Sequence, residues 1–177
     1  MADPKRPAGA GASPQCTAGR RFGLQFINVI VRNCFHLSIP ATDLQTTQQW
    51  YERVLGCRAG RRSETAVILD LGGHQLVAQQ HKPDQALSQS GIYPRHFGLV
   101  YADQQVWRRL VERVEASGEP FAVAPKRRYP SSPLDHWTFF LRDPSGNWLE
   151  FKHYLNPEAV LGCTDQGSVG DPELRER

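Results

Sequence analysis

The stretch Leu141-Arg-Asp-Pro-Ser-Gly-Asn-Trp-Leu-Glu150 repeats an earlier one, Ile68-Leu-Asp-Leu-Gly-Gly-His-Gln-Leu-Val77. The two stretches align with a shift of 73 residues, and only the second ends on a carboxylate. A further echo, with a shift of 60 residues, aligns His36 with His96. Echoes in a fixed order over half a chain indicate two copies of one supersecondary unit.

Hydrophobic periodicity predicts the same order of elements in both copies. For the first copy it predicts a strand at 33–39 ending at Pro40, a helix from a cap at Thr42 or Asp43 to Leu55, and strands at 65–71 and 74–80. For the second copy it predicts a strand at 96–101, a helix at 103–117, a short strand at 119–125, a basic loop at 126–134, and strands at 136–142 and 148–154. The predicted class is therefore α+β, with two βαβββ modules.

We expect one globular domain at 28–156, with module one at 33–81 and module two at 95–154. The ends are predicted to be a disordered N-terminal tail at 1–27 and a polar C-terminal tail at 157–177. Neither half-sheet can bury its face alone. Pairing the modules would form a partly rolled mixed sheet around a cavity, with the helices outside.

Composition predicts a soluble, cytoplasmic protein. Hydrophobic residues make up 40% of the chain and charged residues 22%, which is enough for a core. No apolar stretch is long enough for a membrane span, and the N-terminus lacks the apolar region of a secretory signal. The four cysteines form no C-x-x-C pair, and Cys34 and Cys57 are expected to fill the core of a protein in a reducing compartment.

Charge gives no case for nucleic-acid binding. The formal net charge is only +3. The run Lys126-Arg-Arg-Tyr129 is the one basic cluster with an aromatic residue, and we interpret it as a solvated or substrate-facing loop.

Strand alternation predicts which side chains face the cavity. A buried Glu is costly unless it is paired, hydrogen-bonded or bound to a metal, which draws attention to Glu150. Any one of these polar residues, taken alone, has a purely structural explanation. Two imidazoles and a carboxylate at related positions are, however, the donor set of a divalent-metal site. The side chains expected on the concave face are His36, Gln75, Gln79, His81, His96, His136, Thr138, Glu150 and Lys152.

The residues resemble the vicinal-oxygen-chelate superfamily, which includes glyoxalase I, extradiol dioxygenases, fosfomycin-modifying thiol transferases and bleomycin-binding proteins. The resemblance covers about 120 residues and is most specific in the Asp-Pro-Ser-Gly-Asn segment followed by Glu150. The matching stretches are Phe35-His-Leu-Ser-Ile-Pro-Ala-Thr-Asp-Leu44, Arg95-His-Phe-Gly-Leu99 and Phe139-Phe-Leu-Arg-Asp-Pro-Ser-Gly-Asn-Trp-Leu-Glu-Phe151.

The resemblance implies a metal-dependent enzyme acting on a small substrate with vicinal oxygens. It places His36, His96 and Glu150 as ligands of Fe(II) or Mn(II), leaving open positions for substrate. It also places His81 as the acid/base. His136 and Lys152 are expected to orient an anionic substrate oxygen. Extradiol-dioxygenase-like members are the nearest match, through the stretch Leu134-Asp-His-Trp-Thr-Phe-Phe140.

Two departures from the family keep alternatives open. Val77 stands where glyoxalase I has a fourth ligand, and Phe140 stands where the dioxygenases have a Tyr. A glyoxalase-like lyase or isomerase, a thiol transferase, and a metal-free binding protein like the bleomycin-resistance members are the alternatives. The modules could pair within one chain or across a homodimer.

Overall fold

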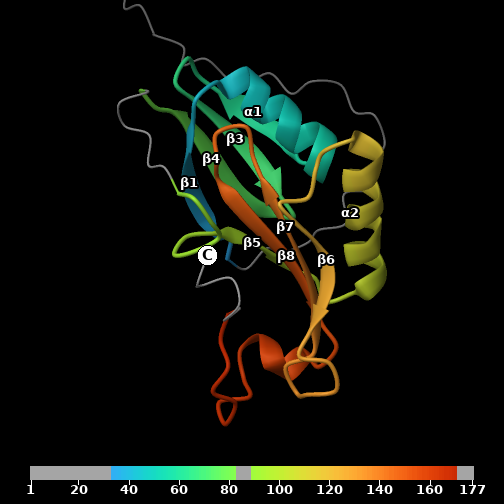
Figure 1. Ribbon diagram of the computed structural model, residues 1–177. Helices are drawn as coiled ribbons and strands as arrows, with labels where there is room; N and C mark the ends of the chain where they lie inside the picture. The colour runs from blue at the N-terminus through green and yellow to red at the C-terminus, as the bar shows by residue number, and fades with distance from the viewer. Residues whose placement is uncertain (1–32, 83–88, 171–177) are drawn as a thin grey trace, which may run out of the picture. The chain divides into compact units, whose positions relative to one another are not determined.

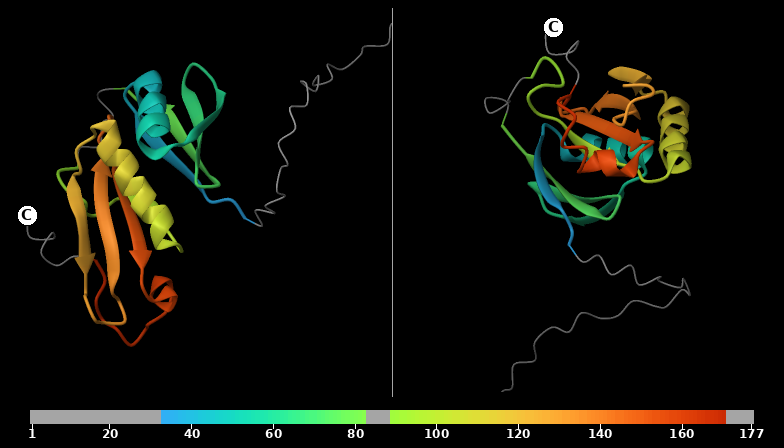
Figure 2. Two further views of the ribbon diagram at one scale, coloured as in Figure 1. Left: turned by 90° about the vertical axis from the view of Figure 1, so that its right-hand side faces the viewer. Right: turned by 90° about the horizontal axis from the view of Figure 1, so that it is seen from below.

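The computed structural model describes residues 33–82 and 89–170, which form two four-stranded mixed sheets (Figures 1 and 2). Each sheet has one parallel pair at its edge and two antiparallel pairs. The predicted α+β class is confirmed, and the sheets remain open. The first sheet has the order β1 (His36–Ala41), β4 (His74–Gln80), β3 (Ala66–Leu71), β2 (Arg58–Arg62), and the second β5 (Phe97–Val100), β8 (Trp148–Tyr154), β7 (His136–Arg142), β6 (Val123–Arg128).

The helices begin and end at the residues that the sequence indicates. Helix α1 (Leu44–Trp50) continues into a π-helical turn, η1 (Tyr51–Leu55), and helix α2 spans Gln104–Ser117. Asp43 caps α1 by accepting a 2.6 Å hydrogen bond from the Thr46 N–H. Gly56 ends the first helix with a left-handed φ of 71°, which glycine adopts without strain. A short 3₁₀ turn, η3 (Pro157–Val160), follows β8.

The strand registers reproduce both sequence echoes. Ser38 lies opposite Val77 in the β1–β4 pair, and Gly98 lies opposite Glu150 in the β5–β8 pair. These pairs are related by the shifts of 60 and 73 residues found in the sequence. The two modules are therefore copies at the level of backbone pairing, and Val77 occupies the position of Glu150.

Strand β1 continues past the predicted stop at Pro40. It pairs only with β4 and forms the edge of its sheet, so the missing N–H of Pro40 interrupts no ladder. Strand β2 was not predicted because its sequence, Arg-Ala-Gly-Arg-Arg, has no apolar alternation. Edge strands with exposed charges are common in sheets.

Two further expectations were wrong. The stretch 126–128 is not a loop but part of β6, where Arg127 pairs with Trp137. The predicted strand at 119–125 is therefore shifted toward the C-terminus. Cys34 is exposed rather than in the core, whereas Cys57 is buried as expected.

One hydrophobic core joins the modules. The fully buried side chains Tyr51 and Val54 on η1 belong to the same cluster as Phe139 and Phe151 of the second sheet. Residues 1–32, 83–88 and 171–177 lie outside the described structure, so the predicted N-terminal tail is not tested.

The Asp143–Asn147 turn carries one of the two sets of polar contacts described between the modules; Arg53 makes the other, with the Ser117 carbonyl and the Glu119 carboxylate. Asp143 is buried and accepts hydrogen bonds from the Tyr51 hydroxyl at 3.1 Å and from the Asn147 amide side chain at 2.7 Å. The same Asn147 nitrogen donates to the Pro40 carbonyl at 2.9 Å, and the Thr42 N–H donates to the Ser145 hydroxyl at 3.0 Å. Burial raises the pKa of Asp143, and these hydrogen bonds oppose that rise.

We expect Tyr51→Phe to lower the free energy of unfolding by about 1–3 kcal/mol, because the buried Asp143 carboxylate loses a donor. Tyr101→Phe is the matched control, since no hydrogen bond from the Tyr101 hydroxyl occurs within 33–82 and 89–170. It should change stability by less than about 0.5 kcal/mol. Urea titration followed by circular dichroism measures both, and equal losses would contradict the role given to Asp143.

Candidate functional site

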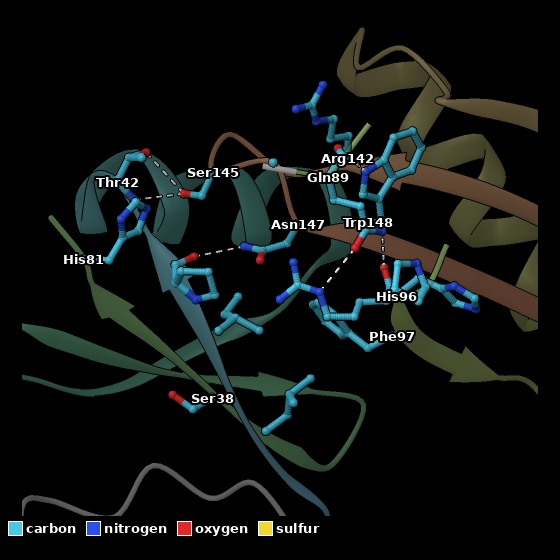
Figure 3. A pocket seen from close by; sticks show the side chains of 16 residues that line it. Ser38, Thr42, His81, Gln89, His96, Phe97, Arg142, Ser145, Asn147 and Trp148 are labelled. Carbon is cyan, nitrogen blue, oxygen red and sulfur yellow. Dashed lines mark hydrogen bonds between the residues drawn. The ribbon is translucent and has the colours of Figure 1, made fainter. Parts of the chain in front are cut away.

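A cavity of about 600 Å³ lies between β1, the start of β5 and the Asp143–Asn147 turn (Figure 3). Thr42 and His81 lie on one side of it, and His96, Phe97 and Trp148 lie on the other. Its volume falls in the range of small-molecule sites. Ser145 and Asn147 of the turn line the cavity, and both hydrogen-bond to module one. The cavity therefore lies between elements that are fixed relative to one another.

His96 and Glu150 meet beside this cavity. His96 Nε2 lies 3.1 Å from Glu150 Oε2, and only 6% of the Glu150 side chain is exposed. The His96 Nδ1–H donates to the Ile92 carbonyl at 2.8 Å, which leaves Nε2 to face the carboxylate. Two ligands at right angles, each about 2.1 Å from an ion, are about 3.0 Å apart, so these two atoms have the spacing of neighbouring metal ligands.

Glu150 already has partners without an ion. Lys152 Nζ lies 2.8 Å from Glu150 Oε2, and the Thr138 hydroxyl donates to Oε1 at 2.8 Å. Burial alone would raise the Glu150 pKa, but the bonds from His96, Lys152 and Thr138 outweigh it and hold the pKa at about 2. The bond to Glu150 raises the pKa of His96, against an opposing effect of burial. The Glu150 carboxylate is therefore ionised. It is paired with its protein partners, and its charge would also suit a metal cation.

His36 does not join this pair within one chain. His36 is exposed at the start of the edge strand β1, where its Nδ1 is 2.8 Å from Gln75 Oε1. Across residues 33–82 and 89–170, no group of three or more His, Cys, Asp or Glu side chains could hold a metal. Two of the three predicted ligands are thus together, and the third lies on the equivalent strand of the other module.

The other predicted site residues take different positions. His81 lines the cavity, and its Nδ1–H donates to the Lys82 carbonyl at 2.7 Å (Figure 3). Lys152 pairs with Glu150 and does not belong to the residues that line the cavity. His136 is 3% exposed and stacks on Tyr154 with ring centroids 4.6 Å apart. Burial lowers the pKa of His136, and its Nε2 has no hydrogen-bond partner in the described structure.

Phe140 lies next to the His96–Glu150 pair. Its ring packs edge-on against His96, with centroids 5.6 Å apart. Phe140 is 2% exposed, so it shields the pair from water on this side without offering a hydrogen bond. A low-dielectric wall of this kind strengthens electrostatic contacts at the pair.

Several cavity residues were not assigned a role from the sequence. Arg95, Trp148 and Asn147 line the cavity. The sequence offered one signal for them, their place next to the motifs: Arg95 precedes His96, and Asn147 and Trp148 follow the Pro-Ser-Gly turn. Strand alternation alone could not indicate Arg95 and Asn147, because they precede β5 and β8, whereas it places Trp148 on the same face of β8 as Glu150.

Comparisons with a family model and with solved structures identify the same family. The family model described as the Glyoxalase/Bleomycin resistance protein/Dioxygenase superfamily matches residues 34–151. A crystal structure of a glyoxalase/bleomycin resistance protein/dioxygenase from Alicyclobacillus acidocaldarius is 38% identical, with a TM-score of 0.68, covering 72% of this chain and 96% of that one.

More distant relatives share the fold. The virulence protein STM3117 of Salmonella typhimurium strain LT2 is 23% identical over 129 residues, which is 73% of this chain and 89% of that protein. The crystal structure of lactoylglutathione lyase from Agrobacterium tumefaciens is 18% identical, with a TM-score of 0.52, over 68% of this chain and 92% of that one. No helix in the described part of the chain has the length and apolar character needed to cross a membrane.

We expect the Glu150 cluster to make the metal-free protein sensitive to acid. A pKa lowered from 4.5 to about 2 stabilises the fold above pH 4.5, and that stabilisation is lost as the pH falls through 2. It corresponds to about 3 kcal/mol. With a chelator present, the free energy of unfolding of the wild type should therefore fall more steeply across this window than that of Glu150→Gln.

Glu115→Gln on α2 is the control, because Glu115 is an exposed carboxylate. It should follow the wild-type pH curve. Parallel curves for the wild type and Glu150→Gln would mean that the cluster contributes nothing to acid stability.

Proposed function

Because the chain belongs to the glyoxalase/bleomycin resistance protein/dioxygenase superfamily, we propose that it is a metal-dependent enzyme acting on a small molecule with two adjacent oxygens. The observation that carries the proposal is the 3.1 Å approach of His96 Nε2 to Glu150 Oε2 beside a cavity of ligand size. Two nitrogens and one carboxylate with open positions suit Fe(II) or Mn(II).

The third ligand, His36, would come from a second copy of the chain. His36 is exposed on β1, and its Nδ1 is occupied by Gln75, which leaves Nε2 toward solvent. Module one therefore presents a single imidazole, while module two presents the His96–Glu150 pair. A two-fold symmetric dimer would bring each His36 to the pair of the other chain and complete two equivalent sites.

Residues around the cavity have distinct roles in this proposal. A bound ion would polarise the two substrate oxygens as a Lewis acid. The Ile92 carbonyl orients His96 through Nδ1, as second-shell partners commonly do for metal ligands. His81 would exchange a proton with the substrate at Nε2, because its Nδ1–H is already donated to the Lys82 carbonyl. Phe140 excludes water beside the ligands.

Within this class we favour oxidation by O₂ of the extradiol-dioxygenase type, supported by His81 lining the same cavity as His96. Glyoxalase-like isomerisation and thiol transfer use related donor sets and are the alternatives. Oxygen consumption with catechols, compared with turnover of thiol adducts, separates them. The absence of a hydroxyl at Phe140 argues for a substrate that needs no phenolic hydrogen bond there.

A metal-free binding protein is the second candidate, and one observation favours it. The Lys152 ammonium lies 2.8 Å from Glu150 and already neutralises the carboxylate that a cation would use. In that case the cavity would sequester a small molecule without changing it. The metal content of the protein decides between the two candidates.

We expect the protein purified without added ions to contain about one Fe(II) or Mn(II) per chain, and Glu150→Ala to lose at least about tenfold in affinity for it. The reason is the loss of the one charged ligand. Plasma emission spectrometry and metal titration measure this, with Glu115→Ala as the exposed-carboxylate control. Unchanged metal content in Glu150→Ala would refute the ligand assignment.

Complementation tests whether two chains share each site. The His36→Ala and Glu150→Ala chains should each bind little metal alone. When the two are unfolded, mixed and refolded, the mixture should bind about one quarter of the metal that the wild type binds. Random mixing makes half of the dimers heterodimers, and each of these has one intact site of two. No recovery, with dimers confirmed by light scattering, would place all ligands within one chain or rule out His36.

A further inference from the structure

The cavity has a charge pattern that a metal site does not require. Within the described ranges, its lining includes Arg95, Arg142, His81 and His96 but no aspartate or glutamate. Glu150 is not among the lining residues and is paired with His96 and Lys152. A ligand in the cavity therefore meets cationic groups without a competing carboxylate.

Arg95 is held in place with its charge available. The Gln89 side-chain N–H donates to the Arg95 carbonyl at 2.6 Å, and the Arg95 Nε–H donates to Gln89 Oε1 at 3.3 Å. No carboxylate within 33–82 and 89–170 pairs with Arg95. Its two terminal amino groups are left in the geometry that binds both oxygens of a carboxylate.

Apolar surface faces the same space. Phe97 and Trp148 line the cavity beside His96 (Figure 3), and Leu37, Ile39 and Pro40 line it from β1. The Arg142 guanidinium lies 5.8 Å from the centre of the Trp148 ring, and the Trp148 indole N–H donates to the Gln89 carbonyl at 3.4 Å. The indole is thus fixed as a flat wall against which a ring can stack.

We propose that the natural ligand is an organic carboxylate with a compact aromatic or cyclic body. The carboxylate binds the terminal amino groups of Arg95, and the body lies against Trp148 and Phe97. A single guanidinium matches the two oxygens and one charge of a carboxylate. Arg95 and His96 both line this cavity, so one small molecule can contact both. This inference rests on the proposed function for its chemistry, and it adds the class of substrate.

The test uses 2-naphthoate and its neutral isostere 2-naphthamide, titrated into chelator-treated full-length protein by isothermal calorimetry. Naphthoate should bind at least about tenfold more tightly, since only the carboxylate can form a bidentate ion pair with the Arg95 guanidinium. Arg95→Gln should remove this preference by weakening naphthoate alone. Trp148→Leu should weaken both probes and keep the preference.

Arg108→Gln is the matched control, because Arg108 is exposed on α2. It should retain the wild-type preference. Equal binding of the two probes, no binding of either at millimolar concentration, or the same loss in Arg108→Gln would overturn the inference. Because the protein is metal-free throughout, these outcomes are independent of the metal analysis, which tests the proposed function separately.

Discussion

A buried carboxylate fixes the turn at which the second module contacts the first, beside the hydrophobic core that the two modules share. Asp143 lies in the turn that precedes β8, and it accepts hydrogen bonds from η1 of the other module and from its own turn. Ionised groups are costly to bury unless every oxygen has donors, so the turn can adopt only the conformation that supplies them. That conformation fixes where β8 begins, and β8 carries Glu150. The geometry of the candidate site therefore depends on a residue that does not line the cavity.

The duplication explains why the site is divided. Equivalent registers place Ser38 and Gly98, and Val77 and Glu150, at the same positions of the two sheets. Each copy has a histidine at or just before its first strand, but only the second has a carboxylate at this position of its last strand. Gln75 hydrogen-bonds His36 in the first copy, whereas Glu150 contacts His96 in the second. The modules have the same strand pairing and different polar side chains, so neither one alone would supply the three ligands of the proposed metal site.

Sequence reasoning succeeded where local chemistry decides the structure. Asp43, Gly56 and Gly118 mark helix ends through capping and left-handed φ, and strand alternation correctly assigned Glu150 and Thr138 to one face and Phe139 and Leu141 to the other. It failed at the edge strands β2 and β6, whose arginine-rich sequences have no apolar alternation and which form strands by pairing with a neighbour. The meeting of His96 with Glu150 was predictable from the echo. The separation of His36 was not, because it depends on how whole modules pack.

Lys152 is the residue that most constrains any account of this site. A cation 2.8 Å from Glu150 weakens the field that would attract a metal, yet it also prevents a buried carboxylate from standing unpaired in the absence of one. A divalent ion held by His96 and Glu150 would therefore compete with the Lys152 ammonium for the same carboxylate oxygen, Oε2.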